Sequence, residues 1–133
     1  MENMNKNEFS KDILHIKNIV REIDRITGKL RDDMQNILKR KGAVVGISGG
    51  IDSSVSLALA VKAFGADKVL GVLLPEKDSS NESKDLALKL AKKFGVQTLE
   101  EDIMGALEGF GCYKRRDEAV SAVFPEYNPD AYK

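Results

Sequence analysis

Three short runs that are predicted to be strands, the first two of them apolar, constrain the fold of this chain more than any other feature, and a helical pattern separates each run from the next. The runs occupy residues 43–47, 68–74 and 96–102. Between them, residues 52–64 and 82–94 repeat apolar side chains at helical spacing, and a glycine follows each helical segment. Alternating strands and helices with short links fold into parallel strands joined by right-handed crossovers. The sequence therefore predicts an α/β fold with a doubly wound parallel sheet.

A long apolar periodicity precedes the first run. Its apolar residues recur at steps of one, three and four, which predicts an amphipathic helical segment over about residues 10–40. Ser10 is the expected N-cap, and Gly28 inside the segment predicts a break or kink. The first apolar run, AVVGI at residues 43–47, has no polar alternation. It is therefore predicted to be a strand that is buried on both faces of the sheet.

The periodic pattern weakens after the third run. Short helices are expected over residues 103–111 and 115–124, followed by an irregular tail. The sequence contains no internal repeat, no low-complexity segment and no shift in composition. We therefore expect a single domain over residues 1–133, with the helical segment 10–40 at its N-terminal end.

Composition limits the kinds of partner that the chain can have. Basic and acidic residues number 21 each, so no global field directs the chain to nucleic acid or to anionic lipid. Hydrophobic residues make up 42% and charged residues 32%, which is typical of a domain with a conventional core. Because no apolar stretch approaches the ~20 residues that span a bilayer, and the first residues lack the apolar region of a secretory signal, we expect a cytoplasmic protein without a membrane partner. The sequence has one cysteine, Cys112, and one histidine, His15, which excludes an internal disulfide and a Cys/His zinc cluster.

A turn of small residues joins the first run to the helix that follows it. Ser48, Gly49 and Gly50 come directly after the strand, and Asp52 and Ser53 follow at once. In an open α/β sheet this position lies at the carboxyl ends of the strands, where the first helical turn offers unpaired N–H groups to a phosphate. The two serines add hydroxyl donors, and a carboxylate beside phosphates suits Mg²⁺. The pattern predicts a phosphate-binding turn, with a tight connection capped by Asp52 as the alternative.

The same stretch carries a family resemblance. It lacks both the Walker A pattern and G-x-G-x-x-G. SGGIDS, residues 48–53, matches the SGGxDS signature of the ATP pyrophosphatase (PP-loop) superfamily. The segment GISGGIDSSVSLALAVKAFGADKVLGVLLPEKDSSNES, residues 46–83, resembles the synthetase part of the NAD synthase family. The resemblance continues through LAKKFGV and EDI and, more loosely, through GCYKRRDEAV and FPEY, so that it covers about residues 10–133.

This resemblance implies a Rossmann-like fold of the adenine nucleotide alpha hydrolase-like type with an ATP site. Residues 46–53 would hold the β and γ phosphates, Asp52 would bind Mg²⁺, and the end of the second strand near Leu74 would receive the adenine. Ser48 and Asp52 are the implied catalytic residues. The residues implied to bind ATP are Gly46, Ile47, Ser48, Gly49, Gly50, Ile51, Asp52, Ser53, Leu74, Ser79 and Ser80.

The resemblance also implies a reaction and partners. In the family reaction, the carboxylate of deamido-NAD attacks the α-phosphate of ATP, which releases pyrophosphate, and ammonia then displaces AMP to form the amide. This is a carbon–nitrogen ligase in NAD biosynthesis, and family members are homodimers. Because the family's synthetase domain continues beyond a region like this one, we expect a truncated ATP-binding half, either part of a longer enzyme, one chain of a split enzyme, or a remnant.

Two other functions stay open at this point. One is a different PP-loop ATP pyrophosphatase that activates another acceptor. The other is a non-catalytic nucleotide-binding or dimerisation module that presents the apolar face of the 10–40 segment. Minor candidates are Asp102, which ends the third run at the same sheet edge, and the charged residues 114–118, which more commonly form a solvated helix start.

Overall fold

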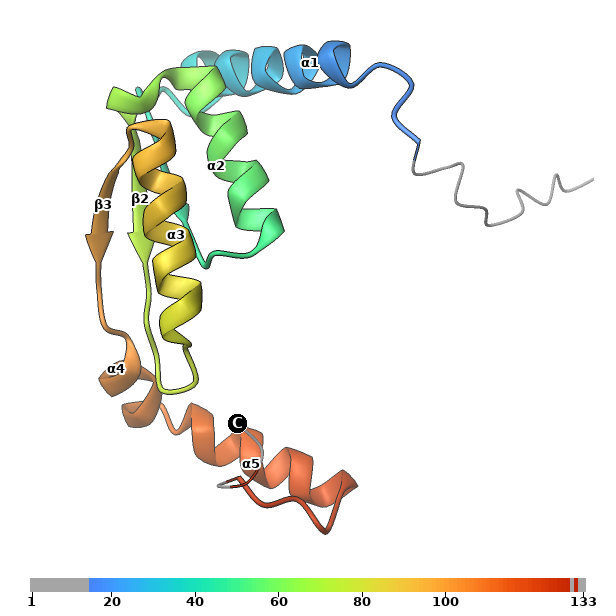
Figure 1. The fold of residues 1–133 in the computed structure, drawn as a ribbon, viewed down its shortest axis with the longest axis vertical. Helices are drawn as coiled ribbons and strands as arrows, with labels where there is room; N and C mark the ends of the chain where they lie inside the picture. The colour runs from blue at the N-terminus through green and yellow to red at the C-terminus, as the bar shows by residue number, and fades with distance from the viewer. Residues whose placement is uncertain (1–14, 130, 132–133) are drawn as a thin grey trace, which may run out of the picture.

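A three-stranded parallel sheet forms the centre of the molecule in the computed structural model, which describes residues 15–129 and 131 (Figure 1). The strands, in their spatial order, are β1 (Ala43–Gly46), β2 (Val69–Leu73) and β3 (Gln97–Glu100). Val45, Gly71 and Thr98 lie side by side across the three strands. Both pairings are parallel, which confirms the predicted α/β fold with a parallel sheet.

The two crossover helices cover one face of this sheet. Helix α2 (Ile51–Phe64) connects β1 to β2, and α3 (Asn81–Phe94) connects β2 to β3. Figure 1 shows both helices on the same side of the strands. Their bounds agree with the sequence prediction to within one residue, and Gly65 and Gly95 are the C-caps. The core lies between these helices and the sheet, and its buried members are Ile47, Leu57, Ala60, Val69, Leu73, Ala87, Ala91 and Val96.

The opposite face of the sheet is apolar but open in the described part of the chain. Val44 on β1 is 71% exposed and Leu99 on β3 is 50% exposed. The prediction that the first strand is buried on both faces is therefore wrong for the described residues. Two successive right-handed crossovers that progress in one direction across a sheet place both helices on the same face, so the alternate side chains of β1 point away from them.

The N-terminal helical segment is shorter than predicted. The predicted N-cap Ser10 lies outside the described residues, and residues 15–18 are not helical. Helix α1 (Ile19–Asp32) begins instead where the Asn18 side chain accepts a hydrogen bond from the Arg21 amide at 3.0 Å. Helix α1 runs through Gly28 without the predicted break, and it continues as a short π-helical turn, η2 (Asp33–Ile37).

Helix α1 packs against the C-terminal end of α2. The Arg31 guanidinium donates to the carbonyl oxygens of Ala63 and Lys62, at 2.8 and 2.9 Å. The Lys62 ammonium also pairs with Asp24 at 3.1 Å. The last carbonyls of an α-helix have no partner within the helix, so α1 supplies donors that the end of α2 needs.

Two further helices follow the sheet. Helix α4 (Met104–Gly109) and helix α5 (Cys112–Val123) confirm the short helices that the sequence predicts, and α5 begins before the predicted residue 115. A short 3₁₀ turn, η3 (Ala66–Lys68), precedes β2. In Figure 1, α4 and α5 lie beyond the ends of the strands, next to the connection between β2 and α3. Over the described residues, none of the helices has the length and apolar character needed to cross a membrane.

Candidate functional site

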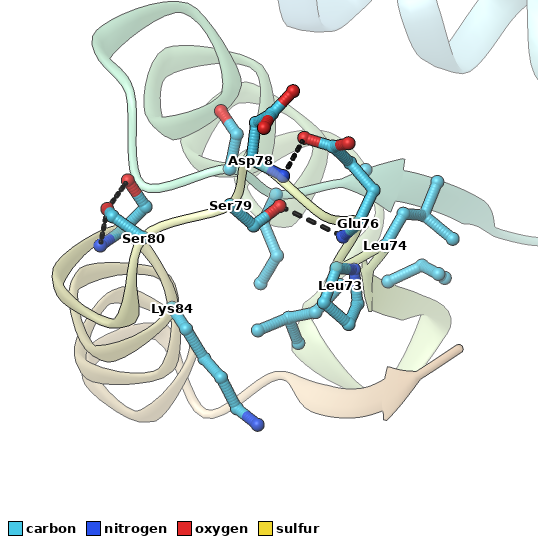
Figure 2. A pocket seen from close by; sticks show the side chains of 13 residues that line it. Leu73, Leu74, Glu76, Asp78, Ser79, Ser80 and Lys84 are labelled. Atoms are coloured by element: carbon cyan, nitrogen blue, oxygen red, sulfur yellow. Dashed lines mark hydrogen bonds between the residues drawn. The ribbon is translucent and has the colours of Figure 1, made fainter. Parts of the chain in front are cut away.

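A cleft of about 510 Å³ opens at the carboxyl ends of β1 and β2 (Figure 2). One side is formed by the end of β1 and the start of the glycine turn (residues 48–50), and the other by the cleft loop (residues 75–80) and the start of α3. Val72, Leu73 and Leu74 line it between these two sides. Parallel α/β sheets bind ligands at this edge. The fold therefore places a cleft where the sequence predicts a ligand.

The structure divides the predicted ATP-binding residues into two groups. The residues that line the cleft are Gly46, Ile47, Ser48, Leu74, Ser79 and Ser80. The residues that follow in the glycine turn and the first turn of α2, outside the cleft lining, are Gly49, Gly50, Ile51, Asp52 and Ser53. The second group directly follows Ser48 in the sequence.

Gly49 sets the path of the glycine turn. Its φ is +79°, a conformation that favours glycine. A Cβ atom on Gly49 would lie 2.4 Å from the carbonyl oxygen of Ser83 and 3.1 Å from Cβ of Leu86. Both contacts belong to α3, so the turn packs directly against the neighbouring helix. A glycine is therefore required here for backbone conformation and for space.

Helix α2 begins without a side-chain cap. Its N-cap residue is Gly50, which has no side chain that could accept from the helix amides. Ile51 is 75% exposed, and Asp52 beside it is also exposed. The first N–H groups of an α-helix lack acceptors within the helix and carry the positive end of its dipole. This arrangement leaves a start of α2 that suits an anion.

The two serines of the motif brace the turn. Ser53 Oγ accepts from the Ser48 amide at 3.2 Å and donates to the Gly50 carbonyl at 3.1 Å. The two hydroxyl oxygens, Ser48 Oγ and Ser53 Oγ, also lie 3.2 Å apart in a hydrogen bond. Ser54 donates a further bond to the Gly50 carbonyl at 2.7 Å. The hydroxyl groups thus hold the shape of the turn in addition to lying near the cleft.

The carboxylate chemistry at this edge fits a metal ion only in company with phosphate. The described residues contain no group of three or more His, Cys, Asp or Glu that could hold a metal. Asp52 offers one carboxylate, in the first turn of α2. Mg²⁺ is commonly held by one or two carboxylates together with substrate phosphates and water. The residues therefore fit a Mg²⁺ ion that arrives with a polyphosphate.

The cleft loop forms the other wall through its own hydrogen bonds. Ser79 Oγ accepts from the Glu76 amide at 3.0 Å, and Glu76 Oε1 accepts from the Asp78 amide at 3.0 Å (Figure 2). Ser80 is the N-cap of α3, because its hydroxyl oxygen accepts from the Ser83 amide at 3.1 Å. The predicted residues Ser79 and Ser80 thus line the cleft while they also stabilise its wall.

Three charged residues that line the cleft were not predicted from the sequence. Glu76, Asp78 and Lys84 line it, and the Lys84 ammonium pairs with Glu100 at 2.7 Å. Lys84 could have been predicted to line the cleft from its position one turn after the Ser80 cap. Asp102 does not line the cleft, because its carboxylate accepts from the Met104 amide at 2.8 Å at the start of α4.

Helix α5 contacts the cleft loop from outside. The Tyr113 hydroxyl donates to Glu76 Oε2 at 2.8 Å and accepts from the Lys77 amide at 3.3 Å. Burial raises the pKa of Tyr113, and the carboxylates of Glu76 and Asp78 raise that pKa further. Arg116 pairs with Asp78 of the cleft loop and with Asp117, whereas Lys114, Arg115 and Glu118 are exposed, as a solvated helix start predicts.

Comparison with known proteins gives consistent matches. The sequence profile of the NAD synthase family matches residues 22–124. An NH₃-dependent NAD⁺ synthetase from Mesorhizobium japonicum is 47% identical over 112 residues, which are 84% of this chain and 35% of that protein. The chain therefore spans about a third of the length of that curated relative.

Solved structures resemble the fold as well. A glutamine-dependent NAD⁺ synthetase from Acinetobacter baumannii, in complex with adenosine diphosphate, has a TM-score of 0.61 and 28% identity, over 82% of this chain and 19% of that one. An NMN synthetase from Francisella tularensis has a TM-score of 0.63 and 26% identity, over 73% of this chain and 40% of that one. With a cleft at the strand ends, an SGGxDS turn beside it and a family match over most of its length, this chain belongs to the NAD synthase family.

Proposed function

We propose that the cleft binds ATP and that the chain is the ATP-binding part of an ammonia-dependent NAD synthase. The uncapped start of α2 beside the cleft is the observation that carries this proposal. The Mesorhizobium relative is named for the synthetase activity, and the Acinetobacter neighbour was solved with adenosine diphosphate. Both support an adenine nucleotide as the ligand.

Charge distribution suggests the direction in which ATP lies. The cleft loop contributes the carboxylates of Glu76 and Asp78; Asp78 and the lining Lys84 are each paired, with Arg116 and Glu100, so that Glu76 is left to repel phosphate. The start of α2 contributes backbone N–H groups and a helix dipole, which attract it. The triphosphate would therefore lie along residues 46–53. The adenine and ribose would lie toward Leu74 and the cleft loop, where apolar side chains and hydrogen-bond acceptors occur together.

The proposed reaction uses this orientation. A carboxylate oxygen of deamido-NAD forms a bond to the α-phosphorus as the bond between that phosphorus and the bridging oxygen breaks, and pyrophosphate leaves. Ammonia then forms the carbon–nitrogen bond, loses a proton, and displaces AMP. The amides at the start of α2 would hold the departing pyrophosphate, and donors preorganised in this way typically contribute roughly 2.7 to 4 kcal/mol each.

Asp52 and Ser48 have proposed roles in this site. Asp52 would hold Mg²⁺, which neutralises phosphate charge when it is bound. Ser48 would keep the glycine turn in shape through its bonds to Ser53 and Gly50, and its hydroxyl lines the cleft. We also propose, from the resemblance, that the protein acts in the cytoplasm as a homodimer.

Isothermal titration of the protein with ATP in the presence of Mg²⁺ tests the central claim. We expect saturable binding, with tighter binding of ATP than of AMP because the phosphate groups contact the start of α2. If ATP and AMP bind equally, or neither produces heat, the proposed orientation and function are wrong. If ATP binds, release of pyrophosphate in the presence of deamido-NAD and ammonia would show the proposed reaction. ATP binding without pyrophosphate release would favour the non-catalytic alternative.

A second acceptor is favoured by one observation. The Francisella neighbour, similar in fold over 73% of this chain, is named an NMN synthetase. The same chemistry would then activate the acid whose amide is NMN. Incubation with each acid, ATP and Mg²⁺, followed by mass spectrometry of the adenylated product, distinguishes the two acceptors, since only the true one gains the mass of AMP.

A further inference from the structure

Helix α5 and the cleft loop are joined by contacts that the ATP-binding chemistry does not use. The residues lie far apart in sequence, with Tyr113 separated from Glu76 by 37 positions and Arg116 from Asp78 by 38. Glu76 and Asp78 both line the cleft. Each of these carboxylates is therefore held from its outer side by one residue of α5.

The Tyr113 hydroxyl makes two bonds to successive residues of the loop. It donates to the Glu76 carboxylate at 2.8 Å and accepts the Lys77 amide at 3.3 Å. Because Glu76 Oε1 accepts the Asp78 amide at 3.0 Å, the same carboxylate links the tyrosine to the fold of the loop itself. Removal of this one hydroxyl group would thus remove one bond from the Glu76 carboxylate and the bond of the Lys77 amide.

Arg116 adds a second attachment on the same face of α5. Its guanidinium pairs with Asp78 and with Asp117, which fixes the arginine between the loop and its own helix. The guanidinium carbon also lies 5.5 Å from the centre of the Tyr113 ring, and the Lys77 ammonium lies 5.7 Å from it. Cations at such distances from an aromatic ring are attracted to its face. The tyrosine is therefore the centre of a cluster formed by α5 and the cleft loop.

We propose that Tyr113 and Arg116 are positioning residues that hold the cleft loop in the shape that receives the nucleoside part of ATP. The inference rests on the proposed function of the cleft. Neither residue lines the cleft, so each acts through Glu76, Lys77 or Asp78. Any movement of α5 is then transmitted to the cleft loop, which makes α5 a means by which the ATP site is adjusted.

Hydrogen exchange measures the positioning without any ligand. In Tyr113→Phe, which keeps the ring but removes the hydroxyl, we expect the Lys77 and Asp78 amides to exchange about tenfold faster, because both bonds that hold them are weakened. Amides in the middle of α3 serve as the internal reference and should not change. Unchanged exchange at Lys77 and Asp78 would overturn the positioning role, whatever the ATP result.

Calorimetric titration with ATP and Mg²⁺ measures the consequence. We expect the Kd for ATP to rise about fivefold in both Tyr113→Phe and Arg116→Gln, from loss of loop order. Arg116→Lys should restore part of the affinity because it keeps the charge opposite Asp78. Arg115→Gln is the matched control, because Arg115 is adjacent and its guanidinium contacts Cys112 Sγ, at 3.7 Å, within α5 itself.

The outcomes separate this inference from the proposed function. If the unaltered protein does not bind ATP, the function of the cleft is wrong and the inference is overturned with it. If the unaltered protein binds ATP and both variants bind it with the same Kd, only the positioning role is overturned. A lower melting temperature with unchanged Kd and unchanged Lys77 exchange would show a purely structural role for α5 and would also overturn it.

Discussion

Helices α2 and α3 begin at the same edge of the sheet, yet their N-termini are built differently. At α3, the Ser80 hydroxyl oxygen accepts from the Ser83 amide at 3.1 Å, so the helix supplies its own cap. At α2, the N-cap is Gly50, which has no side chain. In any α-helix the amides of the first turn have no acceptor within the helix itself. At α3 a side chain of the protein thus accepts a hydrogen bond from the first turn, whereas the start of α2 is left to suit an external anion.

The two starts also share a feature that makes the comparison controlled. The second residue of each helix is acidic, Asp52 in α2 and Glu82 in α3. Acidic residues in a first helical turn are stabilising through the helix dipole. Any special role of Asp52 in metal or phosphate binding must therefore exceed what Glu82 does. Four substitutions test or refine the comparison, from the largest expected effect to the smallest.

Gly49→Ala should have the largest effect. The new Cβ would lie 2.4 Å from the Ser83 carbonyl oxygen at a φ of +79°. The combined backbone strain and overpacking should lower the free energy of unfolding by roughly 2 to 5 kcal/mol, as measured by urea unfolding. ATP binding should be lost because the glycine turn, which leads into α2, no longer packs against α3.

Gly50→Ala is the control for this substitution. Gly50 has a φ of −80°, and a Cβ there would be 3.4 Å from Ser48 Oγ, an ordinary contact. If Gly50→Ala lowers the free energy of unfolding as much as Gly49→Ala does, the contact with Ser83 is not the reason why the turn requires glycine.

Gly50→Asp gives α2 the kind of cap that α3 has. The carboxylate can accept from the first amides, so the free energy of unfolding should stay the same or rise. It would also repel the triphosphate from the helix start, and we expect the Kd for ATP to rise roughly 30-fold, which is the size of a favourable dipole interaction. Gly50→Asn, which caps without charge, should weaken ATP binding less. Equal ATP affinity in Gly50→Asp and the unaltered protein would mean that α2 receives no phosphate.

Asp52→Asn tests the acidic residue of α2 against its counterpart in α3. We expect ATP affinity in the presence of Mg²⁺ to fall about tenfold, and affinity without Mg²⁺ to stay the same, because the substitution removes a metal ligand. Glu82→Gln is the matched control and should leave both affinities unchanged. An identical response of the two variants in titrations with and without Mg²⁺ would contradict the metal role of Asp52.

Ser80→Ala should have the smallest effect. It removes the cap of α3, and loss of such a cap typically lowers the free energy of unfolding by about 1 kcal/mol. Ser80→Asp should recover most of that stability in thermal or urea unfolding, because aspartate is an equally good cap. A variant Ser80→Ala as stable as the unaltered protein would show that α3 does not depend on its own cap.

Local signals in the sequence predicted much of this architecture. Gly65 and Gly95 marked the helix ends, and the run SGGIDS located the turn at the sheet edge. These features depend on residues within a few positions of one another. The family resemblance then added the identity of the ligand as a hypothesis, which local patterns alone leave open.

Features that depend on distant residues were not predicted. Tyr113 meets Glu76 across 37 positions, and no periodicity encodes that contact. The exposure of Val44 depends on which face both crossover helices occupy, whereas the sequence of β1 shows only that the strand is apolar. The start of α1 at Ile19 depends on the Asn18 cap, whereas the sequence prediction placed the N-cap at Ser10. That α2 begins after Gly50 without a side-chain cap, with Asp52 inside its first turn, was also visible only in three dimensions.

The contact of Arg31 with the last carbonyls of α2 has a consequence for the opposite end of that helix. A 14-residue helix is about 21 Å long, and α2 joins the guanidinium at one tip to the glycine turn at the other. Helix α2 is thereby held at its C-terminal end, so that the amides at its N-terminal end keep a fixed orientation toward the cleft. The segment that precedes the sheet thus acts as an anchor for a site that it never touches.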